Sequence, residues 1–168
     1  MALVILTGFM ATGKTEVGRK LAALLGAPFV DTDALVESAT GRTIADIFAR
    51  DGEPHFRALE REAVERACDV DGAIVATGGG TLLDPENRRR LAAAGPVVCL
   101  TATPDELLRR VGGGADRPLL AGGDRLERIR ELLAARAEAY ASAAHTIDTT
   151  GLGVDDVVAR IRSLVADR

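Results

Sequence analysis

Short apolar runs recur along the chain and are separated by longer segments in which apolar residues follow a helical spacing. The runs are Leu3–Leu6, Pro28–Asp31, Ala73–Ala76, Val97–Leu100 and Thr146–Ile147. Runs of this length indicate buried strands, and their alternation with helices is typical of a parallel sheet covered on both faces. The pattern predicts an α/β fold of three layers, α/β/α, with a central five-stranded parallel sheet.

The first apolar run leads into a complete phosphate loop. Residues 8–15 match the pattern Gly-x-x-x-x-Gly-Lys-Thr, and a helix is predicted over Glu16–Leu25. Loop amides and the helix N-terminus supply positive dipoles, Lys14 reaches the β and γ oxygens, and Thr15 offers its hydroxyl to Mg²⁺. The alternative is a turn without a ligand. The flanking strand and helix favour a nucleotide site in a fold of the phosphate-loop NTP hydrolase type.

The chain is acidic and long enough for one domain. At 168 residues it can bury one core, so a single domain over residues 1–168 is expected. A net charge of -4 and a pI of about 5.3 disfavour a general affinity for nucleic acid. No stretch approaches the roughly 20 apolar residues of a membrane span. We expect a monomer without nucleic-acid or membrane partners.

The cysteines and the N-terminus favour the cytoplasm. Cys68 and Cys99 lie far apart in the sequence, so two buried, reduced thiols are expected rather than a disulfide or a metal site. The N-terminus lacks the cationic segment and the small-residue cleavage site of a secretory signal. Both features indicate a cytoplasmic protein.

Glycine clusters at 112–114 and 122–123 bracket a segment that contains Arg117. A flexible linker between domains is one interpretation, but the residues after Asp124 are too few to fold alone. We favour a mobile lid over about residues 112–124, in which Arg117 closes over a bound phosphate and its apolar neighbours exclude water.

Two carboxylates follow the second strand. Asp31 and Asp33 are two residues apart, and on an extended backbone they point the same way. Beside a Mg-nucleotide, Asp31 would hold the water shell of the ion, and Asp33 would accept a hydrogen bond from an acceptor hydroxyl. The strand at 73–76 ends without an acidic residue, so Asp31 would have to supply that charge. The alternative for either residue is a cap on a helix beginning near Ala34.

Arg57 and Glu60 lie three residues apart on a helix that opens at Gly52. Pairing with Glu60 would hold the guanidinium in one rotamer for a carboxylate ligand. A solvated surface pair is the alternative. We place the substrate-binding helical region at about residues 33–60.

A second arginine falls on the apolar face of the helix predicted from about Arg125 to Ala141. The stripe Ile129, Leu133, Tyr140 has Arg136 at the intervening position. A buried arginine without an anion is costly. Arg136 therefore pairs with a structural carboxylate or faces a ligand pocket.

Gly78, Gly79 and Gly80 follow the third strand. The absence of side chains lets a substrate approach the backbone amides there. The alternative is a tight turn that requires positive φ.

Together and in this order, these motifs resemble shikimate kinase, a phosphate-loop kinase of the nucleoside-monophosphate-kinase type. The likeness runs from Leu3 to about Asp148. It implies ATP-dependent phosphorylation of the 3-hydroxyl of shikimate, a step toward chorismate and the aromatic amino acids, with ATP and Mg²⁺ as cofactors. In-line transfer is expected, with Mg²⁺, Lys14 and Arg117 neutralising charge on the moving phosphoryl group and Asp33 orienting or deprotonating the hydroxyl.

The resemblance also assigns site residues. Residues implied at the ATP phosphates are Ala11, Thr12, Gly13, Lys14, Thr15 and Glu16, with Thr15 and Asp31 on the metal side. Positions matching the shikimate site are Asp33, Arg57, Gly79 and Arg136, with Gly78 and Gly80 beside them. Arg117 matches a lid arginine that contacts ATP, and Arg110 matches a residue near adenine. The family often carries a proline in its adenine-contacting loop, where this chain instead offers a backbone contact from Gly153.

Two other functions fit part of the pattern. A kinase for another small acceptor, such as gluconate or a nucleoside monophosphate, would share the nucleotide half of the site. A GTP switch or nucleotide-sensing module is disfavoured, because the sole asparagine, Asn87, is followed by three arginines rather than by the Asn-Lys-x-Asp element of guanine-specific switches.

Overall fold

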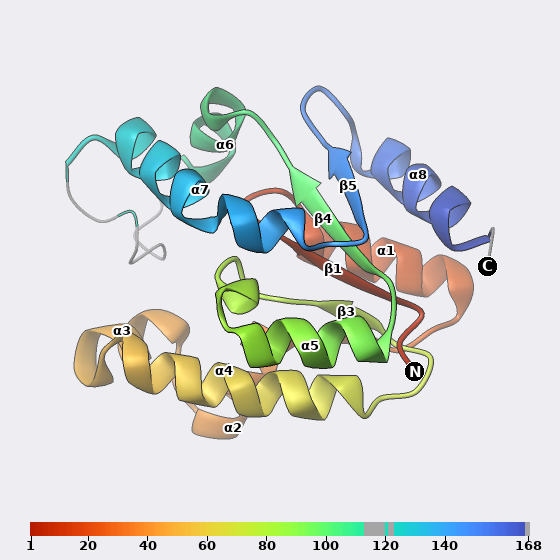
Figure 1. Ribbon diagram of the computed structural model, residues 1–168, viewed down its shortest axis with the longest axis horizontal. Helices are drawn as coiled ribbons and strands as arrows, with labels where there is room; N and C mark the ends of the chain where they lie inside the picture. Colours follow the sequence, from red (N-terminus) through yellow and green to blue (C-terminus); the bar gives the residue numbers. More distant parts are fainter. Residues whose placement is uncertain (113–119, 121–122, 167–168) are drawn as a thin grey trace.

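Five parallel strands form one sheet in the order β2-β3-β1-β4-β5 (Figure 1). This computed structural model describes residues 1–112, 120 and 123–166. The strands are β1 (Val4–Gly8), β2 (Phe29–Asp31), β3 (Ile74–Ala76), β4 (Val97–Thr101) and β5 (His145–Asp148). Each predicted apolar run therefore forms a strand, and the predicted fold class is confirmed.

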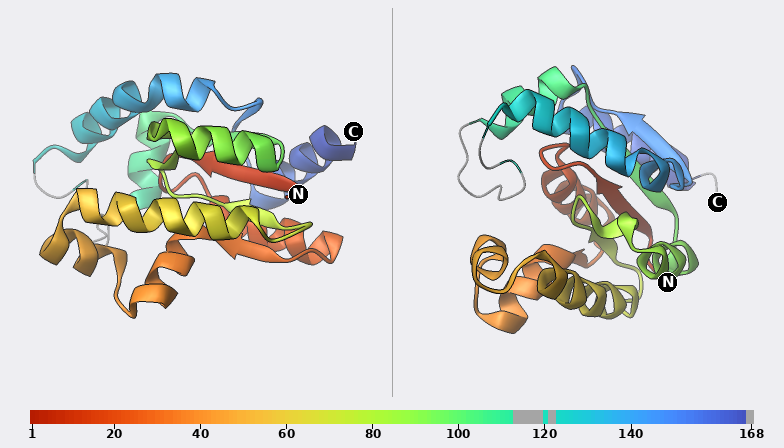
Figure 2. Two further views of the ribbon diagram at one scale, coloured as in Figure 1. Left: turned by 60° about the horizontal axis from the view of Figure 1, so that its bottom comes forward. Right: turned by 60° about the vertical axis from the view of Figure 1, so that its left-hand side comes forward.

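Helices cover both faces of the sheet (Figures 1 and 2). One face packs against α1 (Lys14–Leu25) and α8 (Val154–Ala166). The other packs against α4 (Glu53–Cys68), α5 (Pro85–Ala94), α6 (Pro104–Val111) and α7 (Arg125–Ala141). A further group, α2 (Thr32–Thr40) and α3 (Ile44–Asp51), packs against α4 around Ile47 and Phe56. A 3-10 turn, η1 (Thr81–Leu83), follows β3.

The apolar runs are continuous because both faces of each strand are buried. In β1, Val4 and Leu6 join the core under α1 and α8, whereas Ile5 joins the core on the opposite face. All three side chains are fully buried. The period-two alternation thus supplies two hydrophobic cores from one strand.

Parallel register aligns the carboxyl ends of the central strands. Leu6 lies opposite Ala76, and Ala76 lies opposite Asp31. The segments that follow β1, β2 and β3 therefore meet at one edge of the sheet, where ligands of such sheets bind.

Two sequence expectations about local structure are corrected. The helix expected near Ala34 begins at Thr32, because the Asp31 carboxylate caps it, so Asp33 lies in a helical turn and not on extended backbone. Both cysteines are free, but only Cys99 is buried and Cys68 is half-buried. None of the described helices is long and apolar enough to cross a membrane.

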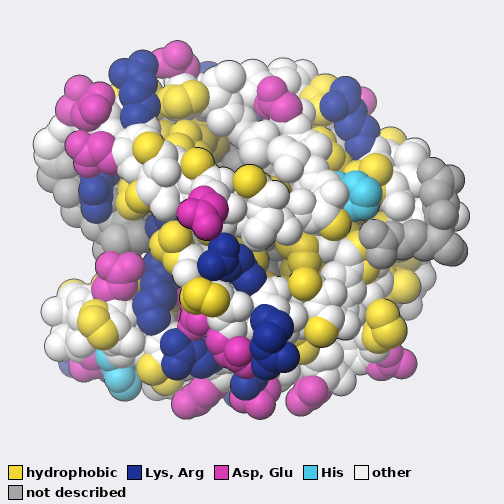
Figure 3. All heavy atoms as spheres, in the orientation of Figure 1, with side chains coloured by type: hydrophobic (Ala, Val, Ile, Leu, Met, Phe, Trp, Pro, Cys, Tyr) yellow, Lys and Arg dark blue, Asp and Glu magenta, His cyan; other side chains and the backbone are white. Residues whose placement is uncertain are grey.

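Basic and acidic side chains are interspersed over α4 and α5 (Figure 3). Arg61 pairs with Asp84, and Arg90 pairs with Glu65 and Glu86. The charges of Arg61 and Arg90 on this face are therefore balanced locally.

Candidate active site

The phosphate loop joins β1 to α1 at the carboxyl edge of the sheet. Gly13 precedes α1 in the left-handed conformation and offers no side-chain acceptor to the first amides of the helix. Ala11 also has positive φ, at 62°. A Cβ on Gly8 would lie 2.1 Å from the Leu100 carbonyl oxygen, so the tight passage beside β4 requires glycine. The result is a helix N-terminus suited to an anion.

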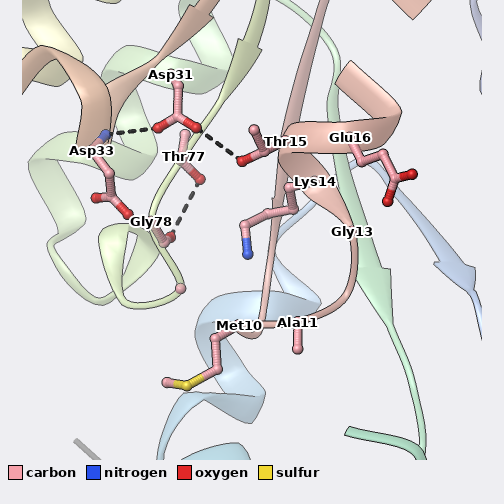
Figure 4. Close-up of a pocket in the computed structure, with 11 residues that line it drawn as sticks. Met10, Ala11, Gly13, Lys14, Thr15, Glu16, Asp31, Asp33, Thr77 and Gly78 are labelled. Atoms are coloured by element: carbon pink, nitrogen blue, oxygen red, sulfur yellow. Dashed lines mark hydrogen bonds between the residues drawn. The ribbon is translucent and has the colours of Figure 1, made fainter. Parts of the chain in front are cut away.

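Lys14 lies at the centre of this loop. Its Nζ donates to the carbonyl oxygens of Gly8 and Phe9, at 2.7 and 2.9 Å. Figure 4 shows the ammonium group between the loop at Met10 and the turn at Gly78. The ammonium therefore faces the cavity in which a phosphate would be held.

The side chains of Thr15 and Asp31 meet across the cavity. Thr15 Oγ1 donates to Asp31 Oδ2 at 2.9 Å, and Asp31 Oδ1 accepts from the amide of Asp33 at 2.9 Å (Figure 4). Asp31 thus caps α2 and faces Thr15 at the same time. The predicted alternative, a cap on the helix near Ala34, is therefore confirmed for Asp31, and the same carboxylate also bonds Thr15.

Asp33 is a carboxylate with a raised pKa. Burial raises its pKa from 3.8 to about 6, and the negative charges of Asp31 and Glu60 add to this effect while Lys14 opposes it. Its Oδ1 is buried and has no hydrogen-bond partner. Asp33 lines the same cavity as Lys14, which has a volume of about 250 Å³. A hydroxyl that entered this cavity would supply the missing partner.

Arg57 is held on α4 by a buried acid. Its Nη1 donates to Glu60 Oε1 at 2.8 Å, and Glu60 is 1% exposed. The second Glu60 oxygen accepts from Thr81 Oγ1 at 2.8 Å. The predicted Arg57–Glu60 pair is confirmed, and it is not a solvated surface pair.

Arg136 lies on the inward face of α7 and is 2% exposed. Its guanidinium stacks over the Phe9 ring, 5.5 Å from the centroid, and Nη1 is 3.5 Å from the Tyr140 hydroxyl. Its Nε has no hydrogen-bond partner. Within the described part of the chain no ion pair of Arg136 with a carboxylate occurs, which favours the ligand pocket over the structural carboxylate.

The glycine turn after β3 is where these side chains converge. A Cβ on Gly78 would lie 3.1 Å from Asp33 Oδ1, and one on Gly79 would lie 3.1 Å from Arg136 Nη1. None of Gly78, Gly79 and Gly80 has positive φ. The alternative of a turn that needs positive φ is therefore wrong, because close approach by side chains is what excludes a Cβ here.

We expect Gly80→Ala to raise the KM for the acceptor by about 10²-fold, because a shift of about 1 Å in a positioning group has effects of this size. The new Cβ would lie 2.5 Å from Arg57 Nη2 and would displace the guanidinium. Steady-state kinetics with both substrates varied checks this. An unchanged acceptor KM, or an equal rise in the KM for ATP, would contradict this use of Gly80.

A second cavity, of about 670 Å³, opens on the other side of the phosphate loop. Arg110 bonds the backbone oxygens of Ala11 and Thr149, at 3.4 and 2.9 Å, and pairs with Glu106. Gly153 lines the cavity, but its amide donates to Asp156. The first cavity and this one share Ala11, Gly13 and Glu16. A nucleotide with phosphates at the loop has room for its base here.

The structure gathers most of the predicted site residues. Thr12 is buried within the loop and donates its hydroxyl to the Phe9 carbonyl. Arg117 and most of the predicted lid, at 113–119 and 121–122, lie outside the described residues. The sequence analysis missed Thr149 and the contact of the Tyr140 hydroxyl with the glycine turn. Thr149 follows the end of β5, and Tyr140 lies four residues after Arg136 on the same face of α7. Either position could have indicated a residue near the site.

Comparison of the sequence with known proteins identifies the family of this chain. The profile of the family described as SKI: Shikimate kinase matches residues 10–166. The chain belongs to the shikimate kinase family. The shikimate kinase of Geobacter metallireducens is 52% identical over 165 residues, covering 98% of this chain and 92% of that protein. The shikimate kinase of Symbiobacterium thermophilum is 50% identical over 168 residues, covering 98% and 97%.

Solved structures show the same fold. A shikimate kinase from Acinetobacter baumannii in complex with shikimate has a TM-score of 0.94 and 36% identity, and the match covers 98% of this chain and 92% of that one. A gluconokinase from Sinorhizobium meliloti has a TM-score of 0.57 and 16% identity, over 98% and 91%. The second likeness is one of fold alone, so the comparisons favour shikimate kinase over gluconate kinase.

Proposed function

We propose that this enzyme transfers the γ-phosphoryl group of ATP to the 3-hydroxyl of shikimate, giving shikimate 3-phosphate and ADP. One observation carries the proposal. Asp33, Arg57 and Arg136 converge on the glycine turn beside Lys14. Two inward guanidinium groups and one carboxylate suit an acceptor that bears a carboxylate and hydroxyls. Sequence identity to shikimate kinases, over nearly the whole chain, supports the same acceptor.

The nucleotide spans both cavities in this proposal. Residues 11–16 hold the phosphates, and the base lies in the larger cavity beside Arg110 and Gly153. The Gly153 amide is engaged with Asp156, and its carbonyl oxygen accepts from the Val157 amide at 3.2 Å. A backbone contact to the base would therefore use the second lone pair of that oxygen. We retain Arg117 as a phosphate contact from the lid over about 112–124, on the resemblance alone.

Mg²⁺ fits the donor set on the phosphate side. The Thr15 hydroxyl and the Asp31 carboxylate are hard oxygen ligands, with their nearest oxygens 2.9 Å apart. Among the described residues no group of three or more His, Cys, Asp or Glu forms a metal cage. Mg²⁺ suits such a sparse site, because it keeps several waters and binds substrate phosphates. When bound, it would neutralise charge on the β and γ phosphates.

The residues of the chain would divide the chemistry. Asp33 accepts the hydrogen bond of the 3-hydroxyl, and takes its proton as the new O–P bond forms and the bond to the ADP oxygen breaks. Lys14 leaves the carbonyls of Gly8 and Phe9 and follows the charge on the transferred group. Arg57 and Arg136 fix the carboxylate end, so that the hydroxyl is presented in line.

The acceptor is tested by a coupled assay of ADP release with shikimate, gluconate and AMP as separate acceptors. We expect shikimate to give a kcat/KM at least about 10²-fold above the others. AMP lacks the carboxylate that the two arginines suit, and the likeness to a gluconokinase is one of fold alone. Comparable turnover with gluconate would overturn the assignment. Nucleotide binding without ADP release for any acceptor would indicate a sensing module instead.

The remaining expectations concern organisation. We propose one domain over residues 1–168, with the acceptor held mainly by the region 33–60 and the glycine turn. A monomer located in the cytoplasm is our working expectation.

A further inference from the structure

Tyr140 joins the two groups that hold one side of the acceptor site. Its hydroxyl donates to the Gly79 carbonyl oxygen at 2.5 Å, and Arg136 Nη1 lies 3.5 Å from the same hydroxyl. The side chain is 8% exposed. It therefore links α7 to the turn after β3, two elements that are more than fifty residues apart in the sequence.

The link from Tyr140 matters because Arg136 has few other polar contacts among the described residues. Arg136 is buried against the Phe9 ring, and in the described part of the chain no carboxylate pairs with it. A guanidinium that stacks on a ring face and lacks a bidentate partner keeps freedom to slide over that ring. The contact between Nη1 and the Tyr140 hydroxyl, at 3.5 Å, is the one hydrogen bond of Arg136 within the residues that the structure describes.

The bond to Gly79 also orients the following peptide. In a trans peptide the C=O and the N–H point in opposite directions, so the Tyr140 hydroxyl fixes the direction of the Gly80 N–H as well. Gly80 lies against Arg57. Burial raises the pKa of the Tyr140 phenol, and the positive charges of Arg136 and Arg57 oppose this rise.

We propose that Tyr140 is a positioning residue of the acceptor site: its hydroxyl holds Arg136 and the glycine turn at the spacing that receives the carboxylate of shikimate. This inference rests on the proposed function. The Tyr140 hydroxyl donates its hydrogen to the Gly79 carbonyl oxygen, so it acts through Arg136 and the turn and does not touch the reacting atoms.

Tyr140→Phe removes the hydroxyl and keeps the ring. We expect the KM for shikimate to rise about tenfold, with kcat and the KM for ATP changed less than about twofold, as for one lost hydrogen bond beside a charge. Ser142→Ala is the matched control, since it removes a hydroxyl that bonds the α7 backbone at Ala139, away from the site. It should leave all three constants unchanged.

An acceptor analogue separates positioning from a general loss of structure. With a shikimate analogue whose carboxylate is reduced to a hydroxymethyl group, the wild-type enzyme and Tyr140→Phe should have equal kcat/KM. A variant that is impaired equally with both acceptors would overturn the proposal, as would an unchanged KM for shikimate.

A measurement on the wild-type enzyme tests the proposal without any substitution that could disturb folding. Tyr140 is the only tyrosine, and the chain has no tryptophan. In protein labelled at tyrosine, the single side-chain resonance should shift on titration with shikimate and half-saturate near the KM. No shift at saturating shikimate would refute the inference. If the wild-type enzyme shows no turnover with shikimate, the proposed function fails; if it turns over and only these tests fail, the role of Tyr140 alone fails.

Discussion

Replacing Lys14 by methionine is expected to lower kcat on the order of 10³-fold while leaving the melting temperature nearly unchanged. The ammonium faces the cavity beside the phosphate loop, where charge would develop on the transferred group. Methionine preserves much of the volume and apolar stem of the side chain but carries no charge. Coupled measurement of ADP release and thermal unfolding of the same preparation check both parts of the prediction.

Lys20→Met is the matched control, because Lys14 and Lys20 are the only lysines of the chain. Lys20 lies on the same helix, half-exposed, and pairs with Asp155. It should retain full turnover. Similar losses in both variants would show that α1 tolerates neither change and would remove the special role of Lys14. Full activity of Lys14→Met would refute the nucleotide site itself.

Asp33→Asn is expected to lower kcat by about 10² to 10⁴-fold and, at neutral pH, to raise the free energy of unfolding by about 2 to 3 kcal/mol. The catalytic loss follows from removing the acceptor for the hydroxyl proton. The gain in stability follows from the pKa of about 6, since holding this buried carboxyl ionised at pH 7 costs about 1.4 kcal/mol for each unit of pKa shift. The same residue is thus expected to support turnover and to weaken the fold.

The pH dependence of that gain identifies its cause. The pKa is higher in the folded state than in the unfolded chain, from 3.8 to about 6, so between these values the folded state binds more protons. Below pH 3.8 Asp33 is neutral in both states and carries no ionisation cost, and stability is lost relative to this level as the pH rises through about 6. Denaturant unfolding should show Asp33→Asn more stable above pH 6 and equal to wild type near pH 4. A gain that is constant with pH would not come from ionisation.

The pH dependence of activity should also report the ionisation of Asp33. If ionised Asp33 accepts the proton, the kcat/KM of the wild-type enzyme for shikimate should fall on the acid side with an apparent pKa near 6. Full turnover by Asp33→Asn would show that another group accepts it.

The sheet was predictable from its short apolar runs, and the long helix α7 from the helical spacing of its apolar residues. Burial of both faces of β1 makes Val4–Leu6 a continuous run, and the range of α7 matched its prediction because Asp124 caps its start. The Arg57–Glu60 pair was predictable from its spacing of three residues on one helix. Each of these features depends on residues that lie close together in the sequence, within one strand or one helix.

Other features depend on contacts between distant elements. The glycine turn requires glycine because Arg57 and Arg136 approach it from two helices, which no spacing within residues 78–80 records. The raised pKa of Asp33 arises from burial and from the charge of Glu60 on another helix. Asp31 was predicted on the metal side or as a cap, and only the geometry of α2 against α1 shows that one carboxylate both caps α2 and accepts from the Thr15 hydroxyl.

The central claim is that a triphosphate cradle and a carboxylate-binding pair of arginines share one edge of the sheet, so that a phosphoryl group passes from one to the other. Phosphorus NMR of a reaction containing the enzyme, Mg²⁺, ATP and shikimate tests it most directly. We predict one phosphomonoester on the 3-oxygen of shikimate for each ADP formed. Release of inorganic phosphate with no new ester, or an ester on a different oxygen, would contradict the account.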